Sequence, residues 1–145
     1  NSHRRTGEDM TKQEVVDLIS DAGFCTLCTV EDGSPKARPM MPYLSDDGRL
    51  IVALLSRSRT IAQVKKNPAV ELCYVDRKMW YCRISGKGAI TENTEYKQTL
   101  WNNVPMLKQY FGSIDDPNFI LMEIEIQKAE VMTPHQREPE FVDMA

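Results

Sequence analysis

The chain has 145 residues, a formal net charge of -3 at pH 7 and a pI near 5.4. This length fits one domain with one hydrophobic core, and the negative charge argues against a nucleic-acid-binding protein that depends on neutralising phosphates. No apolar run approaches the roughly 20 residues that a membrane-spanning helix needs. We therefore expect a cytoplasmic protein with neither a nucleic-acid nor a membrane partner.

Three segments are expected. Residues 1–10 are predicted to be disordered or derived from expression, because Asn1 to His3 resemble the remnant of a tag and lack the apolar core of a secretory signal. Residues 11–132 carry the regular patterns of a folded domain. Residues 133–145 contain prolines and charges with little to pack, so this tail is expected to be loose or to lie on a partner subunit.

The domain opens with a helix signal. Thr11 and Glu14 form a capping box ahead of apolar residues at helical spacing, which predicts an amphipathic helix that ends at Gly23. Further helices are predicted over about Arg59–Lys66 with Ser58 as the cap, after a cap at Asn93 or Thr94, and after Pro105.

Six strands are predicted from apolar patterns separated by turns. Hairpins join most of them, and Gly86 and Gly88 in the middle of the fifth strand indicate a bulge or a bend of the kind that closes barrels. These features favour a mainly β fold, an antiparallel barrel with peripheral helices, over a doubly wound sheet. The predicted strands cover residues 24–31, 35–44, 50–55, 70–75, 79–90 and 120–127.

The four cysteines include one pair with the spacing of a zinc or redox motif, Cys25 and Cys28. In a strand, residues three apart point to opposite faces, so these two thiols cannot share a metal ion. Cys73 and Cys82 form no second pair of this kind. We expect free core cysteines and no metal site.

A candidate anion site lies where the third strand gives way to a helix. Ser58 is suited to cap that helix, whose first N–H groups have no intrahelical partners and carry a partial positive charge. Arg57 and Arg59 have the wrong sign for this position unless an anion sits between them and the N–H groups. Either a phosphate binds here or both side chains extend into water.

The second strand carries another arginine, Arg38, on the same face as Lys36 and Met40. Such an arginine either lies on the solvent face or meets an anion in a cleft. Pro39 cannot donate a hydrogen bond to a neighbouring strand, which predicts an edge or a bulge with backbone groups free for a ligand.

The order of these elements, from about Thr11 to Met132, resembles the pyridoxamine 5'-phosphate oxidase-like split-barrel flavoproteins, particularly the general stress protein branch. The resemblance implies a six-stranded antiparallel split barrel. It rests on residues 33–40 (GSPKARPM), 55–61 (LSRSRTI), 67–70 (NPAV), 84–88 (ISGKG) and Leu100-Trp101.

This resemblance implies a homodimer with FMN at the subunit interface. The phosphate would be held by Arg38 and the Ser58–Thr60 turn, the isoalloxazine would lie along two strands, and Lys97 and Trp101 of the second subunit would complete the pocket. Thr60 stands where the family usually has lysine, so one phosphate contact is weakened or passes to Arg59. The implied cofactor-binding residues are Arg38, Pro39, Met40, Met41, Leu54, Leu55, Ser56, Ser58, Arg59, Thr60, Lys97 and Trp101.

If FMN binds, the flavin supplies the redox chemistry and no catalytic acid or base is required. The leading hypothesis is a reductase that passes electrons from NAD(P)H to a small acceptor such as a quinone or a nitro compound. The chain looks too short for a true pyridoxamine phosphate oxidase. The alternatives are a non-catalytic flavin-binding stress or sensor protein, and a split barrel that uses a deazaflavin or haem.

Overall fold

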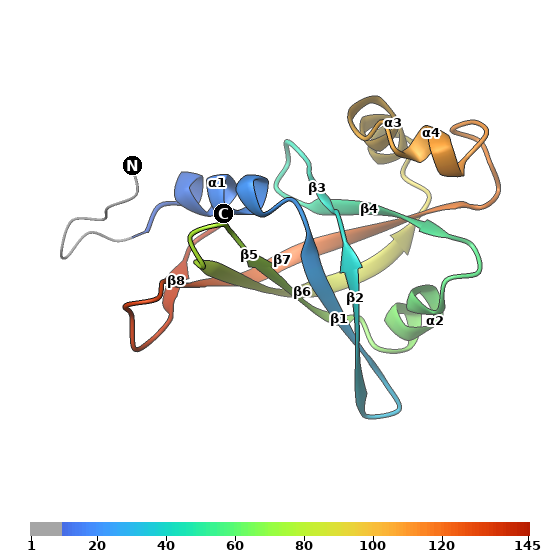
Figure 1. The fold of residues 1–145 in the computed structure, drawn as a ribbon. Coiled ribbons are helices and arrows are strands. Elements are labelled where there is room, and N and C mark those ends of the chain that lie inside the picture. The colour runs from blue at the N-terminus through green and yellow to red at the C-terminus, as the bar shows by residue number, and fades with distance from the viewer. Residues whose placement is uncertain (1–9) are drawn as a thin grey trace.

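The computed structural model describes residues 10–145, and its strands form one strongly curled antiparallel sheet (Figure 1). The expectation of a disordered or expression-derived start therefore falls, Met10 apart, outside the described residues. The elements in chain order are α1 (Lys12–Ala22), β1 (Cys25–Glu31), β2 (Ser34–Met40), β3 (Tyr43–Leu44), β4 (Leu50–Leu55), α2 (Arg59–Lys66), β5 (Ala69–Val75), β6 (Tyr81–Thr91), α3 (Thr94–Asn103), α4 (Leu107–Tyr110), β7 (Phe119–Met132) and β8 (Glu140–Val142).

The strand order is β2-β1-β5-β6-β7-β4-β3, with β8 paired to β7. This confirms the mainly β, antiparallel fold with a few helices. β2 and β3 follow one another in the chain but lie at opposite ends of the sheet, so the curl brings β2 round toward β4 without pairing the two. The barrel is open along this line, which we call the split.

The predicted count of six strands is wrong, because the sheet has eight. The predicted strand 35–44 is two strands, since the chain leaves the edge of β1 after Met40 and joins β4 at Tyr43. The eighth strand lies in the tail, where Glu140–Val142 pairs with Ala129–Val131 of β7. This part of the tail is therefore not loose, because it pairs with the sheet of its own chain.

The local signals for helices are confirmed by the structure. Thr11 caps α1 in a capping box with Glu14, and Gly23 ends the helix with a φ of 74°. The Ser58 side chain caps α2, and the Asn93 side chain caps α3. These three helices therefore begin where a short polar side chain can accept a hydrogen bond from an otherwise unpaired N–H group.

The bend in β6 is also confirmed. The register between β6 and β7 shifts between Ser85 and Gly86, where β7 contains an extra residue. A Cβ atom at Gly86 would collide with the carbonyl oxygen of Glu125, so only glycine allows the two strands this close approach. The bulge helps the sheet to curl.

Two hydrophobic clusters fill the molecule. The larger one lies inside the curled sheet and includes Leu27, Leu72 and Ile84, which are fully buried. The smaller one, around Phe119 and Leu100, lies beneath α3 and α4. Figure 1 shows α1 at one end of the sheet and the pair α3–α4 at the other.

The cysteines are free, as expected. Cys25 is buried and Cys28 is half-buried, in line with their opposite faces on β1. Burial raises the pKa of the Cys25 and Cys82 thiols to about 12, so both stay protonated near neutral pH and are poor nucleophiles. Within residues 10–145, no cluster of three His, Cys, Asp or Glu side chains could hold a metal ion, and no helix is long and apolar enough to cross a bilayer.

Candidate functional site

The split in the barrel contains the main candidate site. Residues Val52–Leu55 of β4 pair with β7 on one edge, while on the other edge the described residues supply a strand partner only at Leu50 and Ile51. The Leu55 carbonyl oxygen accepts a hydrogen bond from the Ser58 N–H at 2.8 Å. Among the strands that the structure describes, β2 pairs with β1 alone. Backbone N–H and C=O groups along these edges need partners, and a ligand in the split can supply them.

A pocket of about 680 Å³ lies in this split, within the size range of cofactor and ligand sites. One wall is built by β2 and β4, and the other by the end of α3, the α3–α4 connection and α4. The residues that line it are Phe24, Pro39, Met40, Met41, Val52, Ala53, Leu54, Leu55, Arg57, Ser58, Leu100, Val104, Met106, Leu107, Tyr110 and Phe111.

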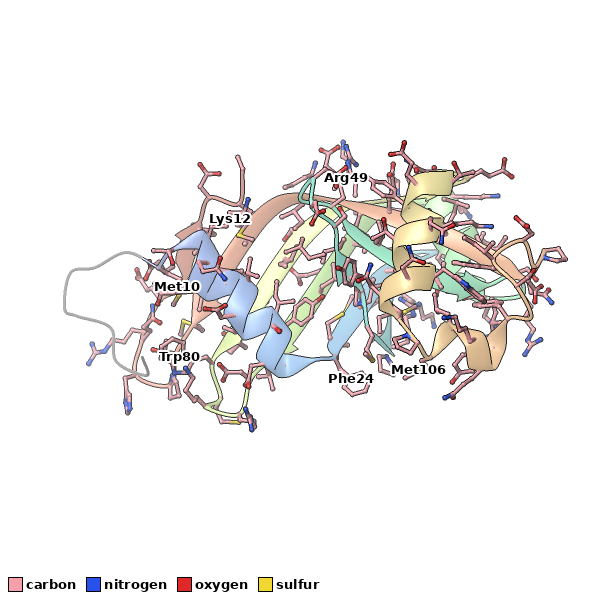
Figure 2. All side chains as sticks on the ribbon, turned by 90° about the horizontal axis from the view of Figure 1, so that it is seen from above. Met10, Lys12, Phe24, Arg49, Trp80 and Met106 are labelled. Carbon is pink, nitrogen blue, oxygen red and sulfur yellow. The ribbon has the colours of Figure 1, made fainter. Side chains whose placement is uncertain are left out.

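The pocket is apolar, with one charged side chain, Arg57, among its described lining residues. Its mouth carries large apolar side chains that are unusually exposed: Phe24 and Tyr110 are each 61% exposed, and Met41 and Met106 are 40% and 43% exposed. Figure 2 shows Phe24 and Met106 on the same side of the molecule, although Phe24 precedes β1 and Met106 lies between α3 and α4. Exposed apolar side chains gathered around a cavity are typical of a binding surface.

The amino end of α2 borders the pocket, because its cap residue Ser58 is one of the lining residues. The Ser58 Oγ atom accepts a hydrogen bond from the Thr60 N–H at 3.2 Å, and Ser58 also lines the pocket. The first turn holds no acidic side chain, and Arg57 and Arg59 are exposed. The partial positive charge of the helix end is therefore not neutralised by a local carboxylate, which suits an anion.

Arg38 does not line the pocket, and its side chain turns toward α2 instead. Its Nη1 atom donates to the Leu27 carbonyl oxygen at 3.1 Å and to the Lys36 carbonyl oxygen at 3.4 Å, while Nη2 donates to Gln63 Oε1 at 2.7 Å. Partial burial lowers the pKa of the Arg38 guanidinium, which remains charged at neutral pH. Of the two alternatives for this arginine, full exposure on the solvent face is excluded.

The structure brings only part of the predicted site together. Pro39, Met40, Met41, Leu54, Leu55 and Ser58 line the pocket, whereas Arg38, Ser56, Arg59, Thr60, Lys97 and Trp101 do not.

Three of the residues outside the pocket pack elsewhere in their own chain. Ser56 donates from Oγ to Asn118 Oδ1 at 2.7 Å. Lys97 places Nζ 4.8 Å from the centroid of the Phe119 ring, and the Trp101 ring lies 6.5 Å from the same ring. Both therefore face the smaller hydrophobic cluster rather than the pocket of their own chain.

The wall of α3 and α4 was missed from the sequence. Its residues are ordinary apolar side chains at helical spacing, and nothing local tells which of them face a cavity. A contact between Tyr96 and Asp47 anchors α3 to the hairpin between β3 and β4. The hydrogen bond raises the pKa of Tyr96 to about 12, and bonds from Ser45 and Tyr96 lower the pKa of Asp47.

Comparison with known protein families shows to which family this chain belongs. A family model for pyridoxamine 5'-phosphate oxidase-like proteins matches residues 10–142. The chain belongs to the pyridoxamine 5'-phosphate oxidase-like family. This confirms the resemblance that the sequence motifs indicated.

Relatives within this family include stress proteins. General stress protein 26 of Bacillus subtilis (strain 168) is 25% identical over 137 residues, which cover 92% of this chain and 96% of that protein. The crystal structure of general stress protein 26 from Bacillus anthracis str. Sterne has 28% identity and a TM-score of 0.74, and the match covers 90% of this chain and 95% of the other.

More distant members of the fold align over similar lengths. A NimC/NimA family protein from Clostridium acetobutylicum has a TM-score of 0.78 at 23% identity, covering 90% of each chain. A pyridoxamine 5'-phosphate oxidase-related, FMN-binding protein from Nostoc punctiforme has a TM-score of 0.67 at 16% identity, covering 88% of this chain and 85% of the other. At these identities the likeness establishes the split-barrel fold alone.

Proposed function

We propose that this chain binds FMN in the split of the barrel and acts as a flavin-dependent oxidoreductase. The observation that carries the proposal is the pocket itself. It joins an apolar cavity to two strand edges with unpaired backbone groups and to the amino end of a helix. FMN has the matching parts, which are a flat apolar ring system, a polar ring edge and a phosphate.

The described residues fit each part of the cofactor. The backbone of β2 and β4, from Pro39 to Met41 and from Leu54 to Ser56, would bond the polar edge of the ring. The amino end of α2, with Ser58 and Arg59, would receive the phosphate, together with the Arg38 guanidinium. The exposed arginines beside this helix end have a physical reason if they share an anion.

Bound FMN would supply hydride and electron transfer, and the protein would supply position and surroundings. The apolar side chains of β4, α3 and α4 would exclude water from one face of the site. We propose NAD(P)H as the reductant and a small quinone or nitro compound as the acceptor. The apolar wall supports an uncharged, flat acceptor, because no charged side chain from α3 or α4 lines the described pocket.

We propose that the functional unit is a homodimer with cytoplasmic localisation. Lys97 and Trp101 do not line the pocket of their own chain and are only partly buried, so each keeps accessible surface that a partner's pocket could use. β2 is an edge strand that is largely exposed along its length, and soluble proteins usually cover such an edge. A second copy of the chain would cover it.

Met106, which lies just before α4 and lines the apolar wall of the pocket, gives a test of the acceptor class. We expect Met106→Glu to raise the KM for a neutral quinone by about tenfold, since a charge then stands in the apolar wall, while FMN affinity stays unchanged. The measurement is steady-state oxidation of NAD(P)H with the FMN-loaded protein. Gln109→Glu is the matched control, because Gln109 is exposed in α4, three residues after Met106, and does not line the pocket.

The two variants separate the competing functions. Equal KM values for Met106→Glu and Gln109→Glu would contradict the proposal that the apolar wall of the pocket contacts the acceptor. An FMN-loaded wild-type protein that oxidises no NAD(P)H with any acceptor would instead support the non-catalytic flavin-binding alternative, and a deazaflavin or haem protein would differ in its absorption spectrum.

A further inference from the structure

A buried amide side chain lies where β1, β2 and α2 meet. Gln63 is in the second turn of α2 and is only 5% exposed, on the same buried helix face as Thr60. Its amide is surrounded by three polar side chains from the β1–β2 hairpin, which are Thr29, Glu31 and Arg38. Both polar atoms of this buried amide have partners, and such a network holds the side chain in one arrangement.

The bonds fix which way the amide points. Gln63 Oε1 accepts from Thr29 Oγ1 at 2.6 Å and from Arg38 Nη2 at 2.7 Å, while Nε2 donates to Glu31 Oε2 at 3.2 Å. A guanidinium can only donate and an ionised carboxylate can only accept. The amide therefore presents its oxygen to the arginine and its nitrogen to the glutamate, and the opposite orientation would lose both bonds.

This arrangement leaves the charge of Arg38 available. The guanidinium has five N–H groups, and three of them donate to Leu27, Lys36 and Gln63. Its partners are two carbonyl oxygens and one neutral amide, and Arg38 forms no ion pair with any described residue. Two N–H groups, on Nε and Nη2, have no partner among residues 10–145.

The side chains around Gln63 include one carboxylate, that of Glu31, which accepts a hydrogen bond from Gln63. Because Glu31 bonds Gln63 Nε2, the amide stands between the carboxylate and the guanidinium. Without the amide, the two charged groups would be free to pair directly. Such a pair would neutralise the arginine at the expense of any anionic ligand.

We propose that Gln63 is a positioning residue that holds Arg38 toward α2 and separates it from Glu31, so that two N–H groups and the positive charge remain for the FMN phosphate. The inference rests on the proposed FMN site. It assigns to Gln63 a role in phosphate affinity and none in contact with the flavin ring.

The test compares FMN with riboflavin, which carries the same ring system without the phosphate. In Gln63→Glu a carboxylate faces Arg38 directly, so we expect FMN affinity to fall by about tenfold or more while riboflavin affinity stays within about twofold. Both affinities are measured by quenching of flavin fluorescence. Gln127→Glu, on the exposed side of β7, is the control for the same change in net charge.

A second variant tests the separating role and guards against misfolding of the first. Gln63→Met keeps a similar volume but frees Glu31 to pair with Arg38, so FMN affinity should again fall. Adding Glu31→Gln to this variant removes the competing carboxylate and should restore part of the loss. A merely structural role for Gln63 would not be relieved by this second change.

The outcomes separate this inference from the proposed function. If wild-type protein binds neither flavin, the proposed FMN site fails and the inference fails with it. Two results with wild-type protein that binds FMN would overturn the role of Gln63 alone. Both Gln63 variants could weaken FMN and riboflavin binding equally, or they could leave both affinities unchanged.

Discussion

Replacing Arg38 with alanine is expected to weaken FMN binding by about 1.5–3 kcal/mol, the range for losing a hydrogen bond to a charged group, which is roughly a 10- to 150-fold loss of affinity. The arginine is half-buried, charged and bonded only to neutral groups among the described residues, so it can direct its remaining N–H groups to a phosphate. Titration of the cofactor-free variant with FMN measures the loss.

The control for Arg38→Ala is Arg77→Ala. Arg77 pairs with Asp21 at 2.7 Å beside α1, away from the split, and the substitution changes the net charge equally. We expect the control to bind FMN like the wild type. Wild-type affinity in Arg38→Ala would show that Arg38 does not hold the phosphate.

The largest effect on stability is expected from Gly86→Ala. The new methyl group would collide with the Glu125 carbonyl oxygen and would lie 3.1 Å from Ile124 Cγ2. Backbone atoms of a paired strand cannot move aside as a flexible side chain can, so the cost should reach about 3 kcal/mol, the upper end for overpacking. In a chain of this size that lowers the melting temperature by roughly 10 °C.

Thermal unfolding followed by circular dichroism measures this change. Gly112→Ala is the matched control, because a Cβ atom there meets nothing within 4 Å and its backbone is not in the left-handed region. The control should unfold within about 2 °C of the wild type. If both variants unfold at the wild-type temperature, the close approach of β6 to the bulge in β7 does not require glycine.

Local chemistry made much of the fold predictable. Ser58 and Thr11 have hydroxyl groups just before apolar residues at helical spacing, so the starts of α1 and α2 could be located from neighbouring residues alone. Gly86 likewise indicated a bend within its own strand. The break between β2 and β3 also has a local signal, because Pro42 lies between them and proline interrupts strands. The pairing of Glu140–Val142 with β7 joins distant segments and left no such signal, which is why it was missed.

The candidate site was predictable where it follows the strands and unpredictable where it depends on packing across the fold. Met40 and Leu54 could be assigned because the predicted strands carry them to the split. The wall around Met106 comes from a segment more than fifty residues further along the chain than β4, and no local pattern indicates which cavity it faces. Gln63 was missed for the same reason, since its three partners all lie on the β1–β2 hairpin.

The central claim is that two copies of this chain hold FMN at their interface. Sedimentation velocity of the FMN-loaded protein, recorded in the visible absorption band of the flavin, tests both parts at once. The account predicts that the flavin absorbance moves with the protein as a single boundary at the mass of a dimer. Flavin that stays unbound, or flavin that sediments with a monomer, would contradict it.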